Sequence, residues 1–271
     1  MKDLRIACQT YTWEMLGPAW RDRPDDVIGA IAAAGYAGIE ISDAMLGCYS
    51  DDPGGLACTL DRHRLELVAV AVSSASGFTE RDRAEGDLEG LRHWLDFVAH
   101  FPGAVISLGS ATAVTGGPRD DKLAVAAEIY NRTAMLGATV GVEVAIHPSS
   151  HRNTLLFDRA DYDRMFSLLD RDSVGWVPDT GHILRGHADI FDTLRAHRDR
   201  IRYLHLKDAD ARGRWAMLGQ GGCDIGAVLE VLNEAPRFNH WVVVEEESDE
   251  AAADPATAVA TNRALMRTLG F

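Results

Sequence analysis

The chain has 271 residues, of which 46% are apolar and 25% are charged, as in an ordinary globular protein. No apolar run approaches the roughly 18 residues of a membrane-spanning helix, so membrane, disordered and fibrous chains are excluded. The 41 acidic residues outnumber the 27 basic ones, and the net charge of −14 would repel a nucleic-acid backbone. The four cysteines form no CxxC pair and the N-terminal segment has no long apolar signal region, so we expect a cytoplasmic protein with reduced cysteines.

Short runs rich in Val, Ile, Leu and Ala recur along the chain, and longer segments with helical spacing lie between them. Eight runs are expected to be strands: 4–11, 37–42, 65–72, 103–110, 141–148, 173–179, 201–208 and 240–247. They recur about every 34 residues, the length of a strand with its crossover helix. Helices are expected over 23–35, 80–101, 119–138, 158–170, 224–234 and 255–269. This rhythm predicts an α/β protein built as a closed (β/α)₈ TIM barrel.

A doubly wound open sheet is the alternative fold. It would carry a Gly-rich phosphate-binding turn after the first strand, where this chain has QTYTWEMLGP. No Pro-rich linker, low-complexity tract or long charge block interrupts the rhythm. We therefore expect a single domain over residues 1–271.

Polar residues gather at the C-terminal ends of the expected strands, where the loops of a barrel converge on one pocket. They are Glu40, Ser73, Ser74, Ser110, His147, Asp179, His182, His205, Lys207 and Glu245. Taken singly, Asp179 could be a helix cap and His205 a buried core histidine. However, the four strands from the fifth to the eighth each deliver a His, Asp or Glu at the same height, which favours a shared site.

The alternation of side chains along a strand refines this set. His205 and Lys207 share one face about 6.6 Å apart, so Lys207 is expected to stand one step above His205. Glu143 shares the face of His147 but lies about 13 Å from it toward the closed end of the barrel. We therefore do not expect Glu143 to be a ligand.

Two imidazoles and two carboxylates around one point suit a divalent ion. We expect one ion, held by His147, Asp179, His205 and Glu245. Mn²⁺ is the first choice, and Co²⁺, Fe²⁺, Mg²⁺ or Zn²⁺ also fits this mixed set, better than Ca²⁺ does. Alternatively, His147 stands off the ion and acts as a base. Such an ion polarises a carbonyl and makes the adjacent C–H accessible to a base, so the natural substrate is a hydroxy-ketone.

Five segments resemble signature segments of the xylose isomerase-like barrels, a superfamily of sugar isomerases, ketose 3-epimerases, inosose dehydratases and endonuclease IV. The segments are GYAGIEIS, VPDTGH, YLHLKD, MLGQGGCDIGAVLEVL and WVVVEEESDE, and the last is similar to the eighth strand of inosose dehydratases in particular. The resemblance implies a metal held by Asp179, His205 and Glu245. It also implies that His182 contacts the substrate near the metal and that Glu40 lies near the sugar.

The chain departs from many epimerases and isomerases of this superfamily at the fifth strand. There VAIHPS places His147 where the family often has glutamate. In ketose 3-epimerases that glutamate and the eighth-strand glutamate act on the two faces of an enediolate, so the change disfavours epimerisation. Inosose dehydratase-like members tolerate this histidine. A base on one side and an acid near the leaving hydroxyl suit β-elimination, so we expect a lyase with catalytic His147, His182, Lys207 and Glu245.

Other hypotheses stay open. A ketose isomerase or 3-epimerase is one, and a C-glycoside deglycosidase-type barrel subunit acting on 3-keto-glycosides is another. An abasic-site endonuclease is disfavoured by the charge and by the strand ends AVSSAS and SLGSAT, which lack the histidines of a trinuclear zinc site. A non-catalytic binding barrel would be expected to have lost at least one of Asp179, His205 and Glu245, and all three are present.

The expected partner is a small keto-sugar or cyclitol, with neither nucleic acid nor membrane. Glu40, His182, Lys207 and Trp13 are expected to contact it, although Trp13 could instead close a lid. No phosphate-binding glycine motif or arginine cluster follows the seventh and eighth strands, which favours an unphosphorylated substrate. The sequence is compatible with a homo-oligomer or with a small partner subunit.

Overall fold

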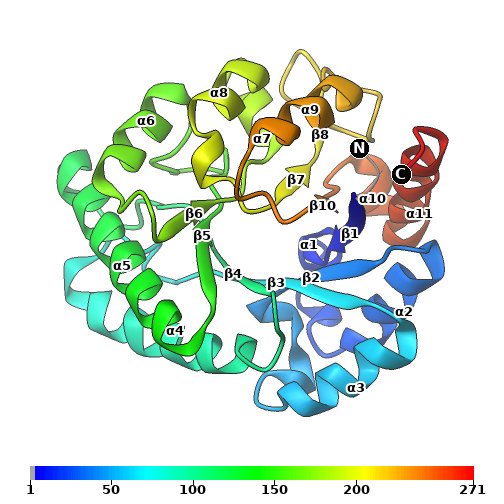
Figure 1. Cartoon of the computed structure of the whole chain (residues 1–271), viewed down its shortest axis with the longest axis horizontal. Coiled ribbons are helices and arrows are strands. Elements are labelled where there is room, and N and C mark those ends of the chain that lie inside the picture. Colours follow the sequence, from blue (N-terminus) through cyan, green and yellow to red (C-terminus); the bar gives the residue numbers. More distant parts are fainter. Residues whose placement is uncertain (1–3) are drawn as a thin grey trace.

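The protein is described by a computed structural model that covers residues 4–271. Eight parallel strands curl around a central axis with helices outside them (Figure 1). The strands are β1 (Arg5–Gln9), β2 (Gly38–Ser42), β3 (Glu66–Val72), β4 (Val105–Leu108), β5 (Glu143–Ile146), β6 (Val174–Trp176), β7 (Leu204–Leu206) and β10 (Trp241–Val244). All eight lie within the expected segments. The predicted (β/α)₈ barrel is therefore confirmed.

The ladder of hydrogen-bonded strands runs β6-β5-β4-β3-β2-β1-β10-β7. Two isolated parallel bridges, Trp176 to Ile201 and Asp179 to His205, join the ends of this ladder and close the barrel. The backbone N–H of His205 donates to the carbonyl of Pro178 at 2.8 Å across the same seam. Closure therefore brings the chain after β6 directly beside β7.

The described residues form eleven helices, and most of them cover the outside of the barrel. They are α1 (Tyr11–Glu14), α2 (Pro24–Ala34), α3 (Pro53–His63), α4 (Ala84–Val98), α5 (Arg119–Val140), α6 (Arg159–Leu168), α7 (Thr180–Arg185), α8 (Ile190–Ala196), α9 (Ile225–Val231), α10 (Asp249–Ala253) and α11 (Pro255–Thr268). The six expected helices correspond to α2, α4, α5, α6, α9 and α11. Among the helices of the described residues, none combines the length and the apolar character needed to cross a membrane.

Short elements complete the chain. A hairpin of β8 (Asp208–Ala209) and β9 (Trp215–Ala216) follows β7, and no sequence pattern indicated it. Single 3₁₀ turns lie at Pro18–Trp20, Asp43–Met45, Gly47–Tyr49, Arg81–Arg83, Arg198–Arg200 and Leu232–Glu234. Two of these turns take up the ends of expected helices. The turn Arg81–Arg83 comes directly before α4, and the turn Leu232–Glu234 comes directly after α9.

Helix α2 shows how the sequence sets an element's ends. Pro24 opens its first turn, where the missing N–H has no intrahelical partner. Gly35 ends it in the left-handed region at a φ of 84°, which glycine adopts without strain. The chain then turns back into β2, as the expected helix over 23–35 implies.

The apolar core has two main parts, besides a small third cluster of Met217, Ala251 and Ala258. The larger one lies between the strands and the surrounding helices. A smaller cluster consists of residues such as Ala7, Ala69, Ala145 and Val243, most of them on the inner faces of the strands. Small side chains at these positions leave room within the barrel for the larger polar groups nearer its mouth.

Candidate metal centre

The four expected ligands point into the barrel because side chains alternate between the two faces of a strand. Ala145, Val177, Tyr203 and Val243 belong to the inner apolar cluster. Each expected ligand stands two residues further along its segment, and side chains two apart on an extended chain share a face. His147, Asp179, His205 and Glu245 therefore follow these four residues onto the same inner surface.

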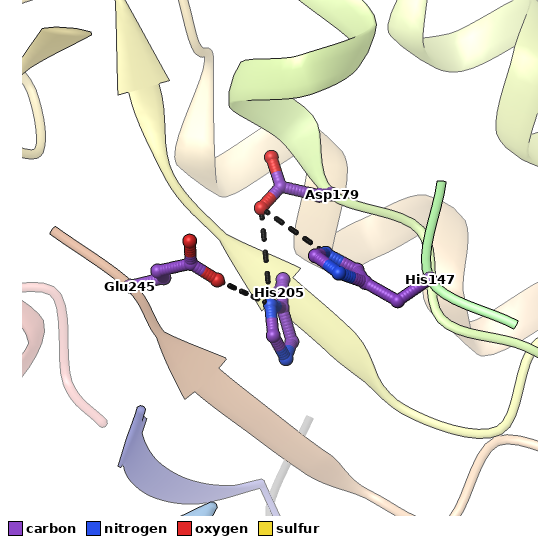
Figure 2. A group of neighbouring side chains, drawn as sticks. All are labelled: His147, Asp179, His205 and Glu245. Atoms are coloured by element: carbon purple, nitrogen blue, oxygen red, sulfur yellow. Dashed lines mark hydrogen bonds and ion pairs between the residues drawn. The ribbon is translucent and has the colours of Figure 1, made fainter. Parts of the chain in front are cut away.

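The geometry brings the four side chains together (Figure 2). One ligand atom from each of them lies within 4.8 Å of the others. His205 Nδ1 is 2.7 Å from Glu245 Oε2 and 3.8 Å from Asp179 Oδ2. His147 Nε2 is 3.6 Å from the same Asp179 oxygen. Four donors from four consecutive barrel positions thus converge on one point.

Unsatisfied atoms at this point fit a metal ion. His147 Nε2 and Asp179 Oδ2 are buried and have no hydrogen-bond partner. The other oxygen of Asp179 caps α7 by accepting from the backbone N–H of His182 at 2.7 Å, so Oδ2 is the oxygen left over. Buried polar atoms rarely stay unpaired, and a nitrogen and an oxygen facing each other are suitable ligands for a divalent ion.

Glu40 holds His205 from behind. Its Oε2 lies 2.7 Å from His205 Nε2, and both side chains are 0% exposed. Gln9 in turn donates from Nε2 to the second Glu40 oxygen at 3.3 Å. A carboxylate on the outer nitrogen fixes the ring and leaves Nδ1 to face the ion. Glu40 was expected to face the interior and to lie near the sugar. It does face the interior, where its carboxylate contacts the His205 ring.

The charges of the cluster also favour a cation. The buried carboxylates are those of Glu40, Asp179, Glu245 and Glu247, and the buried cations are Lys207 and protonated His205. Burial alone would lower the pKa of His205, but Glu40 and Glu245 outweigh it and raise that pKa to about 10. Burial raises the pKa of Glu247 to about 7. The cluster therefore holds a surplus of negative charge that a divalent ion would compensate.

Lys207 stands one strand step beyond His205, as expected. Its Nζ donates to Glu245 Oε1 at 2.8 Å and also contacts Glu247. The ammonium lies 3.9 Å from the centre of the Trp215 ring. Burial would lower the pKa of Lys207, but the two carboxylates raise it above its usual value. Lys207 is thus a fixed positive charge beside one oxygen of Glu245.

A cavity of about 320 Å³ opens beside the ligand group. His147, His182 and Glu245 form part of its wall, and Tyr11 and Glu14 of α1 form another part. Besides Tyr11, its hydroxyl-bearing residues are Ser42, Ser73, Ser74, Ser107, Ser110, Thr112 and Ser149. A wall with this many hydrogen-bonding groups suits a polyhydroxylated small molecule.

Trp13 does not reach this cavity. Its side chain is 1% exposed and packs in the large apolar core. In the single turn of α1, Tyr11 and Glu14 line the cavity, whereas Trp13 faces the interior. The expectation that Trp13 contacts the substrate is therefore wrong, because the orientation of so short a helix is not encoded in a sequence period.

His182 lies beside the cluster and not in it. Its Nδ1 accepts from the backbone N–H of Ser150 at 2.9 Å and lies 2.7 Å from the Ser150 hydroxyl. His151 and Glu247 stand next to it, and one atom from each of the three lies within 4.8 Å of the others. Ser150, His151 and Glu247 were missed by the sequence analysis. The alternation that placed Lys207 above His205 would equally have placed Glu247 above Glu245.

These features define a TIM barrel with a candidate metal centre at the carboxyl ends of its strands. The sequence profile of the xylose isomerase-like TIM barrel family matches residues 28–269. The chain belongs to this family, as its sequence segments implied.

Known proteins resemble the chain over most of its length. An inosose dehydratase from Geobacillus kaustophilus is 27% identical over 267 residues, which cover 86% of this chain and 83% of that protein. An inosose dehydratase from Erwinia tasmaniensis is 28% identical over 261 residues, which cover 84% of each chain. Both relatives are therefore aligned over most of the chain and not over a single motif.

Solved structures share the fold. The apo form of 3-keto-D-glucoside 4-epimerase, YcjR, from E. coli has a TM-score of 0.77 at 18% identity, covering 98% of this chain and 99% of that one. IolI protein with a bound zinc atom has a TM-score of 0.76 at 17% identity, covering 96% and 95%. At these identities the likeness establishes the architecture only.

Proposed function

We propose that the protein is a divalent-metal-dependent lyase that eliminates water from an inosose or a related keto-sugar. The observation that carries this proposal is the group of His147, Asp179, His205 and Glu245, with its orphaned nitrogen and oxygen, at the wall of a hydroxyl-lined cavity. Relatives named inosose dehydratase support the substrate class, and a protein of the same fold that binds a zinc atom is compatible with a metal in this fold.

A bound divalent ion would polarise the substrate carbonyl and acidify the neighbouring C–H. The chain's own residues supply the proton transfer. Glu245 offers two oxygens with different partners: Oε2 lies at His205 Nδ1, whereas Oε1 accepts a hydrogen bond from Lys207 Nζ. The Lys207 ammonium keeps Glu245 ionised, since it holds the pKa of that carboxyl well below its usual range against the opposing effect of burial. Glu245 is therefore suited to remove the α proton, with His147 as the alternative base.

The elimination balances without a further reactant. The base takes the proton from the α carbon, and the C–H electron pair forms the double bond to the β carbon. The β C–O bond breaks, and the departing hydroxide leaves as water with the proton that the base took from the α carbon, so the base is restored. His182 lies at the cavity wall near the base, where it can hold a substrate oxygen.

A ketose isomerase or 3-epimerase is the second candidate, because the fold neighbours include 3-epimerases. Chemistry at the fifth strand argues against it. His147 and Glu245 differ in basicity, whereas exchange of a proton on both faces of an enediolate suits a matched pair of carboxylates. C-glycoside cleavage would use the same α-proton removal with an aglycone as the leaving group. Release of the aglycone in place of water would therefore identify that reaction.

The test is incubation of the manganese-loaded protein in D₂O with 2-keto-inositol, 3-keto-glucosides and free ketoses, followed by NMR. We expect deuterium at the α carbon and loss of water from the cyclitol. Glu245→Gln should lower turnover at least a hundredfold, the usual contribution of a general base. Glu230→Gln, the same change at an exposed position on α9, is the control. Clean interconversion of two epimers without loss of a group would refute the lyase and favour the second candidate.

A further inference from the structure

The Lys207 ammonium has three partners for its three hydrogens. A lysine ammonium carries three N–H donors and no acceptor. One hydrogen goes to Glu245 Oε1 at 2.8 Å and a second goes to Glu247. The third is left for Trp215, since Nζ lies 3.9 Å from the centre of that ring and the electron-rich face of an indole attracts a cation. The Lys207 side chain is 1% exposed, so these three groups, and not water, surround the ammonium.

The first turn of α7 fixes Lys207 against Trp215. The backbone N–H of Lys207 donates to the Thr180 hydroxyl at 2.9 Å, and this hydroxyl donates to the Lys207 carbonyl at 2.5 Å. A Cβ at Gly181 would lie 2.9 Å from Lys207 Cγ and 3.0 Å from Trp215 Cζ3. Glycine is therefore needed at this position for the close approach of the two side chains to α7.

The hairpin after β7 holds Trp215 in place. Trp215 lies in β9 and pairs with Ala209 of β8. Asp210 closes the turn between the two strands by accepting from the backbone N–H of Arg214 at 3.0 Å. The guanidinium carbon of Arg185 lies 4.3 Å from the centre of the Trp215 ring. The position of the ring is thus set by backbone pairing and by a second cation, independently of Lys207.

Lys207 lies behind the cavity wall. Glu245 lines the cavity, whereas Lys207 and Trp215 are not among the described residues that line it. We infer that Trp215 is a positioning residue, which takes the third hydrogen of Lys207 and so commits the ammonium to the two carboxylates. Lys207 then acts on the reaction through Glu245, in place of the substrate contact expected from the sequence. This role in catalysis rests on the proposed function, whereas the arrangement of the three partners does not.

Replacing Trp215 by leucine would leave one hydrogen of the ammonium without a partner. Leucine fills part of the space but offers no electron-rich face, so water would have to take this hydrogen. Water at a buried ion pair weakens the attraction between the charges. Glu245 would then be held less firmly for proton removal, while the residues that line the cavity would be unchanged. Loss of Trp215 should therefore lower kcat and leave KM as it is.

The contact can be observed directly because the chain has only three lysines, at positions 2, 122 and 207. Lys122 is an internal control: its ammonium is also buried, and it donates to Glu80 at 2.6 Å and to Thr115 at 3.0 Å, neither of which is aromatic. In a ¹H–¹⁵N correlation spectrum of zinc-treated protein labelled with ¹⁵N-lysine, the ring current of Trp215 should shift the ammonium protons of Lys207 upfield of those of Lys122. The variants Lys2→Arg and Lys122→Arg assign the signals.

The upfield shift should disappear in Trp215→Leu and persist in Trp215→Phe, which keeps an aromatic ring. Three results would overturn the inference. They are a Lys207 signal at the position of Lys122, a Lys207 signal that Trp215→Leu does not move, and a Lys207 signal lost to exchange with water while that of Lys122 is visible.

Kinetics of the manganese-loaded variants test the role in catalysis. Trp215→Leu should lower kcat about two- to thirtyfold, the range that one cation–π contact supplies, at unchanged KM, and Trp215→Phe should restore most of it. Trp94→Leu, the same change on α4 and away from the cavity, is the control. An unchanged kcat would refute the inference, and a raised KM beside it would show that Lys207 or Trp215 contacts the substrate. The expected lysine shift in a protein without turnover on any keto-sugar would confirm the three partners and refute the proposed function alone.

Discussion

Replacing Glu40 by glutamine tests whether His205 is a metal ligand held from behind. The substitution keeps the shape of the side chain and an oxygen near His205 Nε2 but removes the negative charge 2.7 Å from that nitrogen. Loss of such a partner typically weakens metal binding by about 10- to 100-fold, which corresponds to about 1.4–2.7 kcal/mol. Neither side chain is exposed, so water cannot replace the lost partner.

Proton binding to His205 in the wild type partly offsets this loss of metal affinity. Without metal, the two carboxylates raise the pKa of His205 to about 10, so an ion binding at pH 7 must first displace a proton. Removing the charge of Glu40 lowers that pKa and makes the displacement easier. The variant's deficit in metal affinity should therefore be largest near pH 9 and should shrink toward pH 6.5.

The assay is competition with a chromophoric chelator for zinc and manganese, at several pH values, with Glu40→Gln compared with wild type. Glu230→Gln serves as the control because this glutamate is exposed on α9. A ratio of the two affinities that stays the same from pH 9 to pH 6.5 would show that His205 does not have to lose a proton before the ion binds. A deficit in metal affinity that grows as the pH falls would refute the argument that removing the charge of Glu40 makes loss of the His205 proton easier.

Two further predictions concern Asp179 and Asp43. Asp179→Asn should keep the cap on α7 yet lose metal and activity together, whereas His182→Ala should keep the metal and lose turnover; equal metal loss in both would contradict the assignment. Burial raises the pKa of Asp43, which lines the cavity, from 3.8 to about 6, so its ionised form opposes folding. Asp43→Asn should stabilise the fold by up to about 3 kcal/mol at pH 8, and the gain should fade as the pH drops from 6 to 4. Urea unfolding at pH 8 and pH 4.5 measures it, and an equal gain at both values would refute the cause.

The barrel and the inward placement of the four candidate ligands could be predicted because both depend on local patterns. Each strand is a short apolar run, and its period of two decides which residues face the interior. Once closure is assumed, the ends of neighbouring strands must meet, so His147, Asp179, His205 and Glu245 follow from position alone. The same rule placed Glu143 outside the site, and it lies in an ion pair with Arg202.

Contacts across the barrel could not be predicted in this way. Ser150 and His182 are 32 residues apart, and only the folded loops bring them into hydrogen-bonding distance. The face of Glu40 could be predicted from its strand, but its contact with a histidine 165 positions later could not. The ladder between β2 and β3 also shifts register at Ile39 and Glu40, which no alternation rule reveals. Loops and cross-barrel partners therefore set what each inward residue does.

His205 and His182 show why such partners matter for function. In the sequence both are histidines near the end of a barrel strand, and nothing local separates their roles. In the fold, one has a carboxylate at Nε2 and the other has a backbone N–H at Nδ1. An acceptor at one ring nitrogen leaves the opposite nitrogen able to ligate an ion once its hydrogen is lost, and a donor there makes the opposite nitrogen of a neutral ring a hydrogen-bond donor. A single residue behind each ring thus gives the two histidines opposite hydrogen-bonding partners: an accepting carboxylate at His205 Nε2 and a donating N–H at His182 Nδ1.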